Sequence, residues 1–66
     1  MGTNTDSKAA AVTWARQEAK RTERTHYAFD WKADGRWAIS AGLHVPAERG
    51  YVVAYPSRAT VEVLPL

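Results

Sequence analysis

The chain has 66 residues, enough for one small domain, and its composition excludes some of the usual ways to stabilise so thin a core. It contains no cysteine, which excludes disulfides and thiolate zinc sites. This absence favours self-association as a way to stabilise the small core. No apolar run approaches the roughly 20 residues that cross a bilayer, and the N-terminus has no signal-peptide pattern. We therefore expect a cytoplasmic protein that does not enter a membrane.

Charge and residue type are both biased along the chain. Up to Thr25 five cations stand against three anions, whereas the remainder balances four against four, so the net charge of +2 lies in the first segment. Alanine occurs twelve times, and arginine outnumbers lysine six to three. This second bias is typical of a GC-rich genome, such as that of an actinobacterium or its phage.

The segment from Asp6 to Arg24 is predicted to form an amphipathic helix. It lacks Gly and Pro and is rich in favourable helix formers. At about 100° per residue, one arc is apolar and the opposite arc is cationic. The apolar arc comprises Trp14, Ala11, Ala15, Val12 and Ala19, and the cationic arc comprises Arg16, Lys20, Arg24 and Arg21. The candidate caps at its start are Thr3, Thr5, Asp6 and Ser7, and residues 1–5 are expected to be flexible.

After Thr25 the periodicity changes to two, which predicts strands in the stretch 26–66. Three loops, at 33–35, 46–50 and 57–59, divide this stretch into four strands. Gly35 suits a left-handed position in the first loop, and Pro46 ends the second strand because it has no N–H. The predicted fold is α+β, a single domain with one N-terminal helix packed on a four-stranded antiparallel β-meander.

A meander with these loops sends every odd-numbered strand residue to the same face of the sheet. The predicted opposite pairs are Trp31–Trp37, Phe29–Ile39, Val45–Tyr51, Leu43–Val53, Ala41–Tyr55, Tyr55–Val61 and Val53–Val63. Because a slip of one residue would invert a strand, the agreement of the three loops supports this register. We expect the helix to cover the odd face and the even face to meet solvent.

A single alanine-rich helix is too narrow to cover all the aromatic residues of such a sheet. They could simply be half-buried beside it, since folded surfaces are largely apolar. They could also form a surface that binds another protein or a second copy of the chain. The candidate interaction residues are Trp14, Trp31, Trp37, Tyr51 and Tyr55. The leading hypothesis is a protein-interaction module, either a homodimer or a modulator of a larger host protein, with edge strands available for pairing.

Nucleic acid is the alternative partner. The cationic residues Arg16, Lys20, Arg21 and Arg24 could follow phosphates, and aromatic rings could stack on bases. A solvated helix face explains the same residues, and Glu23 interrupts the stripe. Binding that weakens steeply with salt would favour this alternative.

No catalytic, metal or cofactor site is expected. His26 and His44 are predicted to be close, but a structural zinc requires four ligands. Ser7, Ser40 and Ser57 have no adjacent base or nucleophile elbow in the sequence. So small a sheet should also have little room for a substrate pocket of a few hundred Å³. The sequence therefore predicts a non-enzymatic protein.

Overall fold

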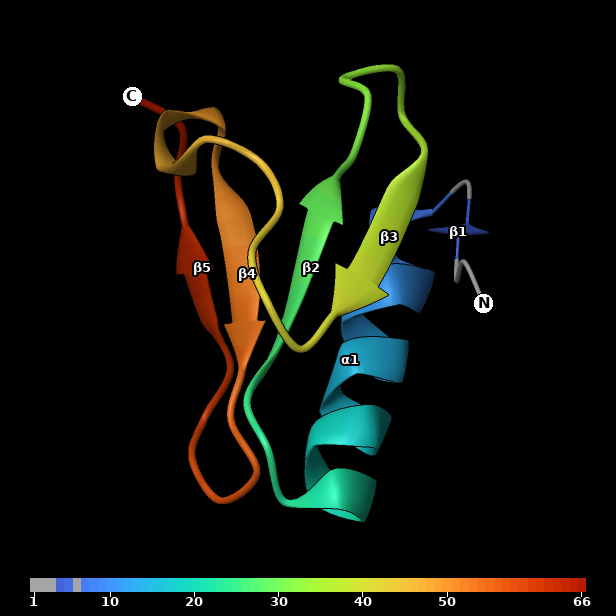
Figure 1. Cartoon of the computed structure of the whole chain (residues 1–66), viewed down its shortest axis with the longest axis vertical. Helices are drawn as coiled ribbons and strands as arrows, with labels where there is room; N and C mark the ends of the chain where they lie inside the picture. Colours follow the sequence, from blue (N-terminus) through green and yellow to red (C-terminus); the bar gives the residue numbers. More distant parts are fainter. Residues whose placement is uncertain (1–3, 6) are drawn as a thin grey trace.

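The computed structural model describes residues 4–5 and 7–66, and in it one helix packs on one face of an antiparallel sheet (Figure 1). The elements are β1 (Asn4–Thr5), α1 (Lys8–Thr22), β2 (His26–Asp30), β3 (Trp37–Ser40), the 3-10 helix η1 (Ala47–Arg49), β4 (Tyr51–Ala54) and β5 (Val61–Val63). The α+β class and the order of one helix followed by four antiparallel strands are confirmed. The short β1 adds a further strand, paired with β3.

The start of α1 is fixed by Ser7, whose Oγ accepts a hydrogen bond from the N–H of Ala10 at 3.2 Å. Of the other candidate caps, Thr5 lies in β1, and the remaining two lie outside the described residues. Most of the segment 1–5, predicted to be flexible, also lies outside them. The helix ends where Glu23 adopts a left-handed φ of 58° and donates its N–H to the carbonyl of Ala19.

The core lies between α1 and the middle of the sheet. Three alanines of α1, spaced four residues apart, are completely buried: Ala11, Ala15 and Ala19. They pack against small side chains of β2 and β4, namely Ala28, Val52 and Ala54, with Val12, Trp37 and Ile39 partly buried at the margin. Because alanine carries only a methyl group, the helix axis can approach the sheet closely.

The strand order corrects the predicted meander. The order across the sheet is β1-β3-β2-β4-β5, so β4 pairs with β2 and not with β3. The predicted second strand ends at Ser40. The Oγ of Ser40 accepts a hydrogen bond from the N–H of Gly42 at 3.2 Å, and this contact stabilises a turn in the chain. The following segment, 41–50, then crosses to β4 on the face opposite α1 (Figure 1).

The register of β2 with β3 is also different from the predicted one. Phe29 lies opposite Ala38 and not Ile39, a shift of one residue. The cause is the turn: the carboxylate of Asp30 accepts the N–H groups of Asp34 at 3.2 Å and Gly35 at 3.1 Å. Ala33 and Gly35 both have positive φ, of 58° and 88°, which lengthens the loop beyond the predicted 33–35.

The predicted pairing of the last two strands is shifted by two residues. Tyr51 lies opposite Val63, and Val53 lies opposite Val61. A shift of two keeps each side chain on its own face, because the period of a strand is two. The faces of β4 and β5 relative to each other are therefore as expected.

The prediction that all odd-numbered strand residues lie on the face covered by the helix is therefore wrong. The even residues of β2 and β4 face α1, as the burial of Ala28, Val52 and Ala54 beneath it requires. Among the four predicted strands, β3 alone presents odd residues to the helix. The odd residues of β2, β4 and β5 lie on the other face.

Two glycines with similar positive φ should respond differently to a methyl group. A Cβ on Gly50 (φ 83°) would lie 2.9 Å from two atoms of Pro65, whereas one on Gly35 (φ 88°) would meet open space. We expect Gly35→Ala to cost about 1–2 kcal/mol of unfolding free energy through backbone strain alone. Gly50→Ala should cost about 1–3 kcal/mol more, because overpacking is added to the strain. Urea denaturation followed by tryptophan fluorescence measures both, and equal losses would contradict the tight crossing at Gly50.

Candidate interaction surface

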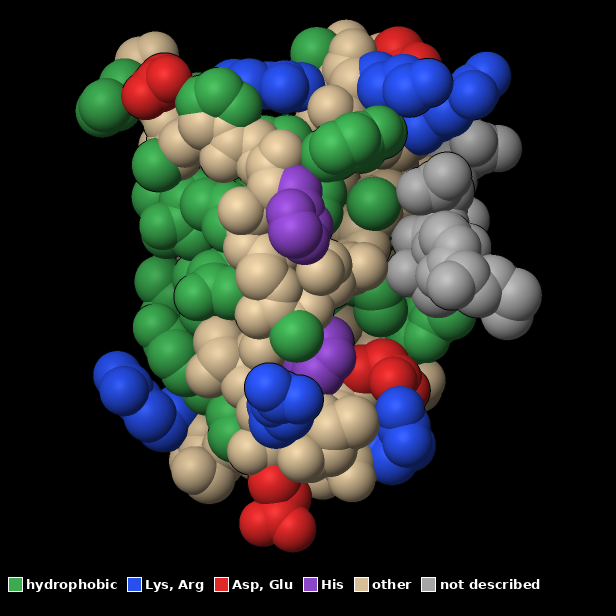
Figure 2. All heavy atoms as spheres, viewed as in Figure 1, with side chains coloured by type: hydrophobic (Ala, Val, Ile, Leu, Met, Phe, Trp, Pro, Cys, Tyr) green, Lys and Arg blue, Asp and Glu red, His purple; other side chains and the backbone are tan. Residues whose placement is uncertain are grey.

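The face of the sheet opposite α1 carries a group of apolar side chains over β4 and β5. We call this group the open face, and its members are Tyr27, Tyr51, Val53, Val61 and Val63. The rings of Tyr27 and Tyr51 contact each other, with centroids 6.0 Å apart. Figure 2 shows hydrophobic side chains gathered on the side of the molecule where Figure 1 places β4 and β5.

The crossing segment 41–50 covers the other half of this face. Phe29 is only 2% exposed there, although no helix lies over it. The ring of His44 packs edge-on against Phe29 at 6.0 Å and against Trp31 at 6.5 Å. The crossing segment therefore covers Phe29 of β2, whereas Val61 at the far edge of the open face is exposed.

The open face ends at an edge strand. β5 is the last strand of the sheet, and Val61 is 44% exposed. Two leucines beyond the strand, Leu64 and Leu66, are also exposed. The N–H of Leu66 donates to the carbonyl of Glu48 at 3.0 Å, which fixes the end of the chain beside η1. The charged residue of β5, Glu62, pairs with Lys8 of α1.

The five candidate aromatic residues are not on one surface. Tyr51 belongs to the open face, and Tyr55 follows β4 with the Arg58 guanidinium 4.6 Å from its ring centroid. Trp31 is exposed in the turn after β2. Trp37 is half-buried on the helix side, and Trp14 lies on α1. The structure thus separates Trp14 and Trp37 from the others.

The sequence interpretation missed Tyr27, Val61 and Val63 as surface candidates. Their alternation was visible, but it was assigned to the layer beneath the helix. With bulky residues on one face and small ones on the other, the narrow alanine arc of α1 could have indicated which face the helix takes.

The cationic helix residues are exposed, but they are not equivalent. Arg21 is held by Glu18 through two hydrogen bonds of 3.0 and 2.6 Å. Within the described part of the chain, Arg16 and Lys20 have no ion-pair partner, and neither has the side chain of Arg24. The predicted stripe therefore retains three unpaired cations.

The two histidines lie in different environments, and their proximity stays a prediction. His26 is buried on the helix side, whereas His44 is exposed on the opposite face, and Figure 2 shows two separate purple surfaces. His44 Nε2 lies 3.0 Å from Ser40 Oγ, so a hydroxyl with an adjacent base exists after all. In residues 4–5 and 7–66 no carboxylate orients His44, and no three metal-binding side chains come together.

A hollow of about 430 Å³ near the start of α1 corrects the expectation that the domain has little room for a pocket. The charged side chains that line this hollow already have partners within the protein. Lys8 pairs with Glu62 and lies 5.7 Å from the ring centroid of Trp37. Arg49 donates to the backbone carbonyl of Asp30 at 2.8 Å. These contacts leave few free polar groups to bind a ligand there.

Comparisons with known proteins add no assignment. No family model matches the chain, and neither a curated protein nor a solved structure was found that matches it. Among the described helices, none is long and apolar enough to cross a membrane.

Phe29 and Trp31 test the role of the crossing segment. Phe29→Ala should lower the unfolding free energy by about 3–5 kcal/mol, because a buried ring is removed from beneath segment 41–50. Trp31→Ala should cost no more than about 1–1.5 kcal/mol, since that ring is 45% exposed and mainly contributes ring contacts. Chemical denaturation of both variants gives the comparison. Similar losses would mean that Phe29 is not covered.

Proposed function

We propose that this protein is a small, non-enzymatic interaction module that self-associates through the open face and the β5 edge. The observation that supports the proposal is that Val61 of the open face is exposed on an edge strand, next to the exposed Leu64 and Leu66. In the rest of the open face, Tyr27, Tyr51 and Val63 are half-buried and Val53 is buried. A contiguous apolar patch next to an edge is typical of a protein-binding surface. Its location in the cytoplasm stays a prediction.

The composition of β5 supports strand addition. Monomeric sheets usually protect an edge with lysine, proline or an inward-pointing charge. β5 has the sequence Val-Glu-Val, and its one charge, Glu62, is paired with Lys8 on the helix side. A second β5 could therefore approach this edge without meeting an unpaired charge on the open face.

In the proposed homodimer, two β5 strands pair in antiparallel fashion about a two-fold axis, so that the sheets of both copies become continuous. Val61 is 44% exposed and Leu64 is 69% exposed, so burying the rest of both side chains in each copy would contribute about 3–7 kcal/mol in total. Association costs about 4–15 kcal/mol, which is of the same order. We therefore expect a weak dimer with a dissociation constant on the order of millimolar, and not a permanent dimer.

Nucleic-acid binding by Arg16, Lys20, Arg21 and Arg24 has less support. Arg21 is paired with Glu18, and Glu23 adds a further negative charge at the helix end. Three unpaired cations would give a modest attraction that falls as salt rises. If this alternative were correct, binding to single-stranded DNA would be strong at low salt and lost at moderate salt.

The test is Val61→Lys, examined by sedimentation velocity over a concentration series. A lysine at the centre of the proposed interface should weaken self-association at least tenfold, because each copy must bury an extra charge. Gln17→Lys is the matched control, since it adds the same charge on an exposed turn of α1. Self-association of the control should be unchanged.

Two outcomes would overturn the proposal. One is a wild-type chain that stays wholly monomeric at a concentration of several millimolar. The other is a dimer that Val61→Lys and Gln17→Lys weaken equally, which would mean that net charge and not β5 governs association.

A further inference from the structure

A second site is indicated by His26, which is 9% exposed and is the one buried polar side chain among the described residues. It is the first residue of β2, and its side chain lies on the helix side near the last turns of α1. Polar side chains are seldom buried unless their hydrogen-bonding groups are used. The two ring nitrogens of His26 differ in this respect.

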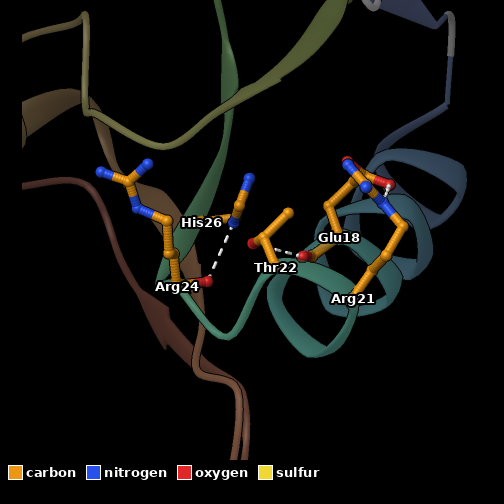
Figure 3. A network of polar contacts seen from close by, with 5 residues as sticks. All are labelled: Glu18, Arg21, Thr22, Arg24 and His26. Carbon is orange, nitrogen blue, oxygen red and sulfur yellow. Dashed lines mark hydrogen bonds and ion pairs between the residues drawn. The ribbon is translucent and has the colours of Figure 1, made fainter.

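One nitrogen is fixed and the other is free. Nδ1 lies 2.9 Å from the backbone carbonyl of Arg24. A carbonyl can only accept, so Nδ1 carries the hydrogen, and in the neutral imidazole Nε2 then presents a lone pair. In Figure 3 this second nitrogen points away from the Arg24 carbonyl. Within residues 4–5 and 7–66, Nε2 has no hydrogen-bond partner, and no unpartnered side-chain nitrogen or oxygen is buried there, so Nε2 is accessible to solvent at the hollow.

His26 lines a hollow of about 270 Å³ between α1 and the end of β3. The other lining residues are Trp14, Glu18, Ile39 and Ser40. Trp14 and Glu18 are four residues apart, so they lie on the same side of the helix. The hollow thus brings together a histidine lone pair, a carboxylate and an indole ring.

Glu18 supplies a lasting negative charge. Both carboxylate oxygens accept hydrogen bonds from Arg21, and these bonds lower the pKa of Glu18 below its usual value. Burial opposes the shift in part, whereas the charge of Arg21 adds to it. In Figure 3 the Glu18 carboxylate and the Arg21 guanidinium point toward each other, and Thr22 stands between this pair and His26 in the view. Arg21 is 68% exposed in its side chain, so solvent screens much of its positive charge.

The lining is rich in acceptors and poor in donors. The Ser40 hydroxyl is already engaged by His44 Nε2 at 3.0 Å and by the N–H of Gly42 at 3.2 Å. The remaining groups are the His26 lone pair, the Glu18 carboxylate and the Trp14 ring, whose face attracts cations. A ligand that carries several N–H donors and a positive charge is complementary to all three.

We propose that this hollow binds an alkylammonium group, such as a free primary amine or the side chain of a lysine. The ammonium donates to His26 Nε2 and to Glu18, and it lies against the ring of Trp14. Each contact is charge-assisted, but the site is open and Arg21 competes for Glu18, so affinity is on the order of millimolar. This site is independent of the open face.

The experiment is an NMR titration of the full chain with n-butylammonium chloride, with butan-1-ol as the neutral control. We expect saturable shifts of the His26 Nε2 and Trp14 indole resonances with the amine alone. Glu18→Gln should weaken binding about tenfold, because a charge-assisted hydrogen bond is lost. Glu23→Gln, which removes the same charge outside the hollow, should leave affinity unchanged. Trp14→Ala provides a second weakened variant that spares the core.

A parallel titration with Nα-acetyl-lysine N-methylamide distinguishes the source of the ammonium. Binding of both probes identifies a lysine side chain as a suitable ligand, whereas binding of n-butylammonium alone identifies a free amine. The proposal is overturned if neither probe saturates at ten times the expected dissociation constant. It is also overturned if Glu18→Gln and Glu23→Gln have equal effects, or if butan-1-ol binds as well as the amine.

Discussion

The close contact between the alanine stripe of α1 and the sheet is the constraint on which the rest of the structure depends. Ala11, Ala15 and Ala19 have no exposed surface, and the strand residues that they meet are also small. A helix this close leaves no room for a ring beneath its axis. The bulky residues of β2 and β4 must therefore occupy the opposite face, which has no helix of its own. The crossing segment covers part of that face, and the open face is what it leaves uncovered.

The local features of this chain were predictable, and the long-range ones were not. Ser7 was among the candidate caps, and the positions of helix and strands follow from periodicity. The register of β2 with β3 depends on the Asp30 carboxylate, which binds two turn amides that no hydrophobic pattern reveals. The strand order depends on where β3 stops, and a short turn at Ser40 decides it. A slip of one residue then moved every aromatic of β2 to the other face.

The same misassignment affected the candidate site. The prediction places the aromatic residues of the strands together because they share odd numbers, yet Trp37 and Tyr51 lie on opposite faces in the structure. The importance of His26 could not be predicted either, because its burial depends on the contact of β2 with the end of α1. Sequence composition correctly suggested a thin core that leaves apolar surface. It could not indicate which apolar residues remain outside.

The central position of β2 has a consequence for how the chain assembles. The residues of β3 that pair with β2 are close to it in the sequence, as Trp37 is to Asp30. Tyr27 and its partner Val53 in β4 are far apart in the sequence, because β3 and the crossing segment lie between them. The entropy lost in closing a loop increases with its length, so pairing with β4 is the more expensive step. The helix and the first hairpin can form from local contacts, and the last hairpin then docks onto them. Until it docks, one edge of β2 and the ring of Phe29 lack their native cover.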